Sequence, residues 1–302
     1  MKELERNKKS GWEEITDEEK NKIYKFSNEY INFLNKAKTE REIVKEIEIL
    51  AREKGFKSLN EYSELYPGDK VYYINREKNI YLSIIGEESI EEGINIIGSH
   101  ADSPRLDLKP NPLYQDGNLA YLKTHYYGGI KKYQWTAIPL AIHGVIVKEN
   151  GEKIYVSIGE NDDEPIFTIT DLLPHLAKEQ QQKKLSEAIN AENLSIIVGS
   201  IPDKEEEKDR VKSYILKLLN QKYGINEEDF VSSELEIVPA FKCRSLGLDE
   251  SLVAGYGQDD KVCVYTSVRA ILNMEKPKKT AVCLVSDKEE IGSMGNTGME
   301  SH

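Results

Sequence analysis

The sequence predicts an α/β protein with an inserted β-rich domain, and three observations lead to this fold class. Amphipathic helical patterns alternate with short apolar β-like runs before residue 106, and the same alternation returns after residue 246. Between these positions, β-like runs are separated by connections rich in Gly, Asn and Asp. We therefore expect one α/β domain from residues 1–106 and 246–302, interrupted by an inserted domain of residues 107–245.

Composition and charge exclude several classes of protein. Hydrophobic residues make up 39% and charged residues 31% of the 302 residues, which is typical of a globular protein. The net charge of −12 argues against a nucleic-acid partner, because phosphate binding needs concentrated Lys and Arg. No apolar run approaches the roughly 18 residues of a membrane helix, and the charged N-terminus does not resemble a secretory signal. The three cysteines, Cys243, Cys263 and Cys283, are widely spaced, which indicates buried thiols in a reducing compartment. We therefore expect a cytoplasmic protein without a membrane partner.

Two helices are expected at the start of the first domain. Thr16 with Glu19, and Thr39 with Glu42, have the spacing of capping boxes. Gly55 is expected to end the second helix. Apolar residues form one stripe along that helix: Ile43, Val44, Ile47, Leu50 and Ala51.

Strands are expected at residues 71–74, 80–85, 94–97 and 280–285, and a helix from 260 to about 273. The run at 94–97 is short and wholly apolar apart from Asn95, which favours a strand buried on both faces. In the inserted domain, the sequence favours strands within 135–148, 153–158 and 195–199 and a helix within 207–223.

Three pairs of metal-ligating or proton-transferring side chains lie beside strand or helix ends, where α/β sheets bind ligands. A hydrolytic zinc pair needs His and carboxylate ligands, a bridging carboxylate and a nearby base. The pairs are His100 with Asp102, Asp259 with Asp260, and Glu289 with Glu290. In an extended His-X-Asp segment both side chains lie on one side, so Asp102 can accept from the second ring nitrogen of His100.

Each pair also has a simpler interpretation. His100 can be a surface residue at a strand end, Asp259-Asp260 can cap a helix, and Glu289-Glu290 can lie in a solvated loop. The occurrence of all three at element ends favours a metal site. Phosphate binding by the Gly-rich residues 292–298 is disfavoured, because no Lys follows the glycines as in a phosphate-binding loop.

Three long segments resemble the aspartyl aminopeptidase/aminopeptidase I family of zinc metallopeptidases. They are residues 98–110 (GSHADSPRLDLKP), 257–266 (GQDDKVCVYT) and 286–298 (SDKEEIGSMGNTG). The resemblance, which runs across nearly the whole chain, implies a mixed-sheet zinc-peptidase catalytic domain with an inserted β-rich dimerisation domain. It implies two zinc ions per complete subunit, with cobalt or manganese as possible substitutes.

The resemblance also assigns roles. His100 would bind one zinc with Asp102 as its partner, Asp259 would bridge the two ions, Glu289 would be the general base and Glu290 would bind the other zinc. Asp260 would support its loop, and the peptide bond between Asp259 and Asp260 would be cis. His175 would reach the active site of a neighbouring subunit, within dimers that assemble into a larger closed homo-oligomer.

The chain departs from the family pattern at its C-terminal end. The family has one further Asp and one further His ligand well beyond the Glu-Glu motif, and His302 is too close to take that role. The resemblance therefore implies that the catalytic domain is incomplete here and that a 302-residue fragment is inactive by itself. His125 and His143 lie in β-like runs without evident carboxylate partners, so we expect both to be structural.

The expected function is that of a metalloaminopeptidase that releases N-terminal residues from peptides with a free N-terminus. The preferred N-terminal residue, acidic or apolar, does not follow from the sequence. The alternative is an inactive scaffold or receptor that retains the peptidase fold, although such a protein would not need both Glu289 and Glu290.

Overall fold

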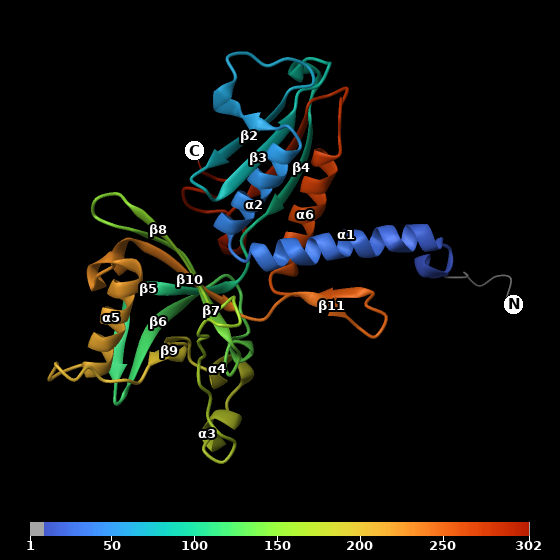
Figure 1. Ribbon diagram of the computed structural model, residues 1–302. Coiled ribbons are helices and arrows are strands. Elements are labelled where there is room, and N and C mark those ends of the chain that lie inside the picture. Colours follow the sequence, from blue (N-terminus) through green and yellow to red (C-terminus); the bar gives the residue numbers. More distant parts are fainter. Residues whose placement is uncertain (1–8, 302) are drawn as a thin grey trace, which may run out of the picture.

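The computed structural model describes residues 9–301, which form two lobes, each built on its own β-sheet (Figure 1). Most of the charged N-terminal segment and His302 lie outside the described residues. The structure confirms a mixed α/β fold with several sheets. No helix in the described part of the chain combines the length and apolarity needed to cross a membrane.

The first lobe contains a five-stranded mixed sheet. β13 pairs in parallel with β4 and antiparallel with β3, so the carboxyl ends of β4 and β13 meet at one edge of the sheet. The spatial order is β1 (Lys57–Ser58), β2 (Lys70–Asn75), β3 (Asn79–Ile84), β13 (Ala281–Ser286) and β4 (Asn95–His100).

Three helices accompany this sheet: α1 (Asp17–Lys36), α2 (Glu40–Glu53) and α6 (Gln258–Leu272). The Glu19 amide donates to the Thr16 hydroxyl at 3.2 Å, as the capping box predicts. The Thr39 amide donates to the Glu42 carboxylate at 3.0 Å, as also expected. Gly55 follows α2 with a φ of 84°, a conformation that glycine adopts without steric cost.

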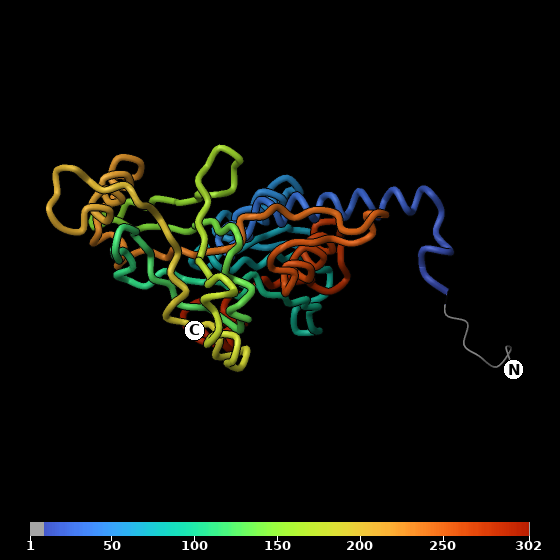
Figure 2. The backbone as a smooth tube through the Cα atoms, turned by 90° about the horizontal axis from the view of Figure 1, so that it is seen from below, coloured from blue at the N-terminus to red at the C-terminus, as the bar shows by residue number. Residues whose placement is uncertain are grey.

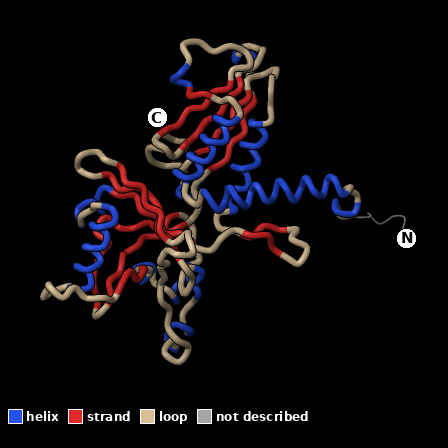
Figure 3. The backbone as a smooth tube through the Cα atoms, viewed as in Figure 1, coloured by secondary structure: helices blue, strands red, loops and turns tan. Residues whose placement is uncertain are grey.

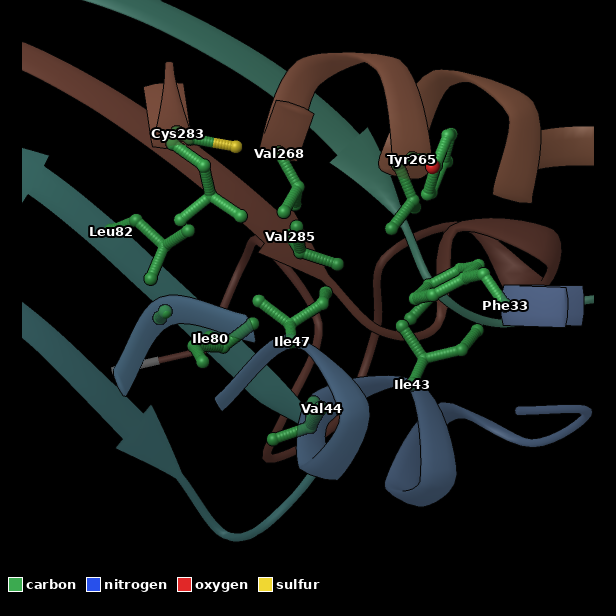
Figure 4. Close-up of a cluster of buried hydrophobic side chains, with 14 of the residues drawn as sticks. Phe33, Ile43, Val44, Ile47, Ile80, Leu82, Tyr265, Val268, Cys283 and Val285 are labelled. Atoms are coloured by element: carbon green, nitrogen blue, oxygen red, sulfur yellow. The ribbon is translucent and has the colours of Figure 1, made fainter. Parts of the chain in front are cut away.

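The core of the first lobe lies where the sheet meets α2 and α6 (Figure 4). Ile43 and Ile47 of the predicted stripe are fully buried, and they lie with Leu82 of β3 and Val285 of β13. Val268 of α6 closes the cluster from the other side. Helical periodicity in residues 43–51 therefore identified the buried face of α2.

The second lobe is an antiparallel sheet of six strands, and helix α5 (Arg210–Tyr223) packs on it (Figure 3). Short helices α3 (Lys178–Gln181) and α4 (Leu185–Ala188) lie in the connections. The spatial order is β8 (Lys153–Ile158), β7 (Leu140–Val147), β10 (Ser233–Pro239), β5 (Arg105–Asp116), β6 (Leu119–Tyr127) and β9 (Ile196–Gly199).

Two of these strands, β5 and β10, had no counterpart among the strands expected from sequence, and β6 was expected only as the β-like run around His125. β5 contains Pro110 and Pro112, which cannot donate ladder hydrogen bonds. The pairing of β5 with β6 shifts register between Leu108 and Leu113 to accommodate them. These prolines interrupt the strand pattern, so β5 was not predicted from the sequence.

The two lobes meet at a cluster of buried charges, and Figure 2 shows both lobes with α1 extending beyond them. Arg105, at the start of β5, pairs with Glu40 of α2 at 3.2 Å and with Glu236 of β10 at 3.1 Å. Lys78 approaches Glu40 at 2.8 Å. Because these charges are buried, removing one partner would leave another uncompensated, so they define how the lobes sit together.

A small hairpin beside α1 completes the fold. It is formed by β11 (Arg244–Leu246) and β12 (Leu252–Ala254). The Tyr24 hydroxyl of α1 donates to the carbonyl of Asp249 in the turn of this hairpin at 2.7 Å.

Three expectations about burial and contacts were wrong. The run 94–97 is not buried on both faces: Ile96 and Ile97 are 62% and 46% exposed, because β4 lies at the edge of the sheet. Cys263 is exposed, whereas Cys243 and Cys283 are buried as expected.

His143 is the third correction, since it has two carboxylate partners. Its Nδ1 lies 2.7 Å from Glu42 of α2, and its Nε2 lies 2.9 Å from Glu160. Pattern analysis missed these partners because Glu42 lies 101 residues away and in the other lobe. The expectation of a structural residue remains, now as a link between the lobes.

Candidate metal centre

The candidate site lies at the sheet edge where β4 and β13 end. His100 is the last residue of β4 and is in register with Ser286, the last residue of β13. The chain then turns at Lys288, whose φ is 67°, into a 3₁₀ turn at Glu289–Ile291. The start of α6 contributes Asp259 and Asp260. Parallel pairing thus brings together residues about 190 positions apart in sequence.

His100 has one ring nitrogen held and one facing carboxylates. Nδ1 lies 3.1 Å from the carbonyl oxygen of Asp102 and 3.3 Å from its Oδ1. Nε2 lies 3.4 Å from Asp259 Oδ1, 3.7 Å from Glu289 Oε2 and 3.9 Å from Asp260 Oδ2. With Nδ1 directed at acceptors, Nε2 is the nitrogen available to a metal ion.

Asp102 is fully buried and contacts both sides of the site. Its Oδ1 accepts from the Glu289 amide at 3.2 Å, and its Oδ2 accepts from the Glu290 amide at 3.1 Å. Its Oδ2 also accepts from the Tyr127 hydroxyl at 2.8 Å. Burial raises the pKa of Asp102, but the hydrogen bonds from His100, Tyr127 and Glu290 outweigh it and lower that pKa.

The two aspartates at the start of α6 differ in exposure and in their hydrogen bonds. Asp259 exposes 84% of its side chain, and its carbonyl accepts from the Ser103 hydroxyl at 2.9 Å. Asp260 is mostly buried, and its Oδ2 accepts from the backbone N–H of His100 at 3.3 Å. The peptide bond between them is cis, as the family resemblance predicts. Both have non-helical backbone angles, so the regular helix begins after them.

The two glutamates also differ in environment. Glu289 exposes 58% of its side chain beside His100. Glu290 is partly buried, and this burial, followed by the charge of Asp259, raises its pKa. A Cβ placed on Gly128 would meet Glu290 Cβ at 3.1 Å, so the end of β6 approaches Glu290 closely.

The donor set suits zinc, which binds imidazole nitrogen and carboxylate oxygen. Two ligand atoms on one tetrahedral zinc are about 3.4 Å apart, since each lies about 2.1 Å from the ion. The separation of His100 Nε2 from Asp259 Oδ1 is 3.4 Å. Within residues 9–301, however, no three His, Cys, Asp or Glu side chains lie close enough together to hold an ion. The described residues therefore provide a matched pair of donors with further carboxylates nearby.

The electrostatics around His100 favour positive charge. Burial lowers the pKa of His100, but the hydrogen bond and charge of Asp102, with Asp260 and Glu289, raise it to about 9. A site that stabilises imidazolium stabilises other cations for the same reason. Chemically, the arrangement can attract a cation to His100 Nε2 beside an accessible carboxylate.

His175, the remaining predicted site residue, lies elsewhere. It is exposed in a turn at residues 174–176 of the second lobe, and it borders a cavity lined by Thr136, Asp171 and Gln180. No hydrogen bond or ion pair among the described residues joins it to His100 or the carboxylates around it. The structure brings together the other predicted residues, His100, Asp102, Asp259, Glu289 and Glu290, as well as Asp260.

Tyr127 was missed by sequence analysis. It comes from β6 of the second lobe and contacts Asp102 directly. Nothing in its local sequence, Tyr126-Tyr127-Gly128-Gly129, distinguishes it from a strand end followed by a turn.

Comparisons with known proteins identify the family of the chain. Residues 33–302 match the family described as aminopeptidase I zinc metalloprotease (M18). A probable M18 family aminopeptidase 1 of Borreliella afzelii is 51% identical over 296 residues, covering 97% of this chain and 65% of the relative. A probable M18 family aminopeptidase 1 of Clostridium acetobutylicum is 51% identical over 298 residues, covering 97% of this chain and 64% of the relative.

Solved structures give the same result. The crystal structure of an M18 aminopeptidase from Thermotoga maritima has a TM-score of 0.93 and 49% identity, covering 98% of this chain and 64% of that one. Aminopeptidase I from Clostridium acetobutylicum has a TM-score of 0.90 and 47% identity, covering 98% and 66%. The chain spans 64 to 65% of the length of these two curated relatives. It belongs to the M18 (aminopeptidase I) family of zinc metalloproteases.

Proposed function

We propose that the protein of which this chain forms part is a zinc aminopeptidase that releases N-terminal residues from peptides. The observation that carries the proposal is the position of His100 Nε2 at the carboxyl end of β4, where it faces two carboxylates from the start of α6 and one from the turn after β13. Membership of the M18 family supports zinc as the metal. We infer two ions per complete subunit and a cytoplasmic location.

Three residues would hold metal in this proposal. His100 would bind one ion through Nε2, Asp259 would bridge two ions with its exposed carboxylate, and Glu290 would bind the second. Asp102 would orient His100, and Asp260 would hold the His100 backbone through their 3.3 Å hydrogen bond. Zinc supplies a Lewis acid that polarises a carbonyl and lowers the pKa of bound water toward neutrality; cobalt or manganese could replace it.

Glu289 is the proposed general base. Its carboxylate is the more exposed of the acidic pair and lies 3.7 Å from His100 Nε2, so water can reach it beside the metal position. It would accept a proton from the attacking water and later give one to the leaving amine. General base catalysis of this kind typically contributes about 10²- to 10⁴-fold in rate.

The second lobe is proposed to mediate self-association. Exposed apolar side chains flank His175 in the turn: Leu172, Leu173 and Leu176 are 55%, 58% and 64% exposed. Neighbouring apolar side chains of this size favour contact with another protein surface. We propose that the turn docks on a second copy within a dimer, where His175 would donate to the developing oxyanion, and that dimers form a larger closed assembly.

The test uses the full-length gene product. Zinc content is measured by mass spectrometry of the dialysed protein, and hydrolysis is measured on aminoacyl p-nitroanilides that carry acidic or apolar residues. The N-acetylated form of the best substrate is the control, because an aminopeptidase requires the free amine. Bound zinc with cleavage of the free substrate alone is the expected result. A well-folded protein that binds no zinc would instead favour the inactive scaffold.

A further inference from the structure

Tyr127 connects the second lobe to the candidate metal centre. It is the last residue of β6, and its hydroxyl donates to Asp102 Oδ2 at 2.8 Å. The other groups that contact the Asp102 carboxylate in the described residues are the His100 ring and the amides of Glu289 and Glu290. All three belong to the first lobe. Tyr127 is therefore the contribution of the second lobe to this carboxylate.

The ring of Tyr127 is itself held in place. The guanidinium carbon of Arg105 lies 4.0 Å from its centroid, in the geometry of a cation–π contact. Arg105 is buried and pairs with Glu40 of the first lobe and with Glu236 of the second. Because the charges that join the lobes fix Arg105, they also restrict the ring stacked on it.

The environment of the Tyr127 hydroxyl favours its neutral, donating form. Burial, followed by the charge of Asp102, raises the pKa of Tyr127 far above its ordinary value. A neutral phenol can donate to Asp102, whereas a phenolate could not. The neutral phenol thus matches the 2.8 Å donor geometry seen toward Asp102 Oδ2.

A second contact places the same strand end against the site. Gly128 follows Tyr127, and a Cβ there would lie 3.1 Å from Glu290 Cβ and 3.3 Å from Glu290 Oε2. The strand end thus lies close to Glu290 at Gly128 and contacts Asp102 through Tyr127. A shift of β6 would disturb both partners together.

We propose that Tyr127 is a positioning residue that holds the Asp102 carboxylate, and through it His100 and the Glu289–Glu290 backbone, in the arrangement that binds metal. The inference rests on the proposed zinc site. It predicts that zinc affinity depends on how the second lobe sits on the first. A purely structural role would instead make Tyr127 affect unfolding but not zinc binding.

The test compares Tyr127→Phe with Tyr126→Phe in the full-length protein. Tyr127→Phe keeps the ring over Arg105 and removes only the donor. Tyr126 is the adjacent strand residue, 41% exposed and stacked on His125, so its variant controls for loss of a phenol on β6. Zinc dissociation constants are measured by competition with a chromogenic chelator. Loss of a group that orients a metal ligand typically costs about 10- to 100-fold in affinity, and we expect this for Tyr127→Phe alone.

A spectroscopic readout is independent of catalysis. The ring ¹⁵N shifts of His100, assigned with His100→Gln, report the tautomer and hydrogen bonding of the imidazole. We expect them to change in metal-free Tyr127→Phe and to stay at wild-type values in Tyr126→Phe. Unchanged shifts together with unchanged zinc affinity would overturn the inference, even if the variant unfolded at lower temperature.

A second variant covers the case in which Tyr127→Phe does not fold. Incorporation of p-aminophenylalanine at position 127 keeps the ring and restores an N–H donor in place of the hydroxyl. It should fold and bind zinc with an affinity much closer to wild type than a variant without a donor. The positioning role would be contradicted if the p-amino variant folds but its zinc affinity falls as far as that of Asp102→Asn. Failure of the wild-type protein to bind zinc would refute the proposed function itself, a distinct outcome.

Discussion

The buried carboxylate of Asp102 accepts the backbone N–H of Glu290 at 3.1 Å, so a residue just beyond β4 holds the loop that follows β13. The same carboxylate accepts the Glu289 amide at 3.2 Å. Glu289 and Glu290 lie 187 and 188 positions after Asp102 in the sequence, and these two hydrogen bonds hold the two segments in one arrangement. The acidic pair owes its placement to this carboxylate as well as to the strand that precedes it.

Asp102→Asn should destabilise the site and the fold together. An amide nitrogen cannot accept a hydrogen bond, so a donor among Glu289 N–H, Glu290 N–H and the Tyr127 hydroxyl loses its partner. An unpaired buried donor costs about 1–3 kcal/mol, which urea unfolding would detect. Zinc affinity should also fall about 10- to 100-fold. Asp163→Asn, at an exposed position, is the matched control, and equal behaviour of the two variants would contradict the prediction.

The acidic pair should separate base from ligand. Glu289→Gln is expected to reduce kcat by about 10²- to 10⁴-fold with zinc content nearly unchanged, because it removes a base. Glu290→Gln is expected to lower zinc content as well, because it removes a ligand. Metal analysis beside steady-state kinetics distinguishes them, with exposed Glu300→Gln as the control. The opposite pattern would exchange the two roles.

His175 should act across a subunit boundary. Inactive Glu289→Gln subunits mixed with inactive His175→Ala subunits should regain about a quarter of wild-type activity at a 1:1 ratio. Half of the dimers are then mixed, and one of their two sites is intact. Mixing Glu289→Gln with the double variant should restore nothing, since neither partner supplies Glu289. Absence of recovery after verified subunit exchange would remove His175 from a neighbour's site.

The link between the lobes through His143 should weaken at alkaline pH. Burial lowers the pKa of His143, but its hydrogen bonds to Glu160 and Glu42 raise it to about 9. Two lysines also face this cluster: Lys38 pairs with Glu160 at 2.7 Å, and Lys261 donates to the Lys38 carbonyl at 2.7 Å near Glu42. Because the pKa of His143 is higher in the folded than in the unfolded protein, protonated His143 stabilises the fold. This stabilisation is complete at pH values below the unfolded pKa of about 6.5 and is lost as the pH rises through about 9.

The corresponding measurement is urea unfolding of wild type and His143→Gln at about pH 6 and about pH 10. The difference between the two proteins should be on the order of 3 kcal/mol at the lower pH and should shrink at the higher pH. His125→Gln provides the control, because His125 is exposed on β6 and stacks on Tyr126. A difference that does not change with pH would show that the charge of His143 does not hold the lobes together.

The sequence by itself determined the local elements and the site residues that follow them. The capping boxes at Thr16 and Thr39 depend on residues three positions apart, and the buried stripe of α2 depends on helical periodicity. His100 and the glutamates could be found because each closely follows an apolar strand. The roles given to them came from resemblance to a family with long, ordered motifs, and those roles remain predictions.

Only the tertiary structure decided which distant residues meet. The Tyr127 hydroxyl reaches Asp102 because β6 pairs with β5 in a particular register and because buried charges seat one sheet on the other. His143 meets Glu42 for the same reason, across the two lobes. The exposure of Ile96 and Ile97 depends on strand order, which places β4 at an edge although its composition is that of a buried strand. Local patterns record propensity and periodicity, whereas these contacts depend on register, strand order and the packing of one lobe on another.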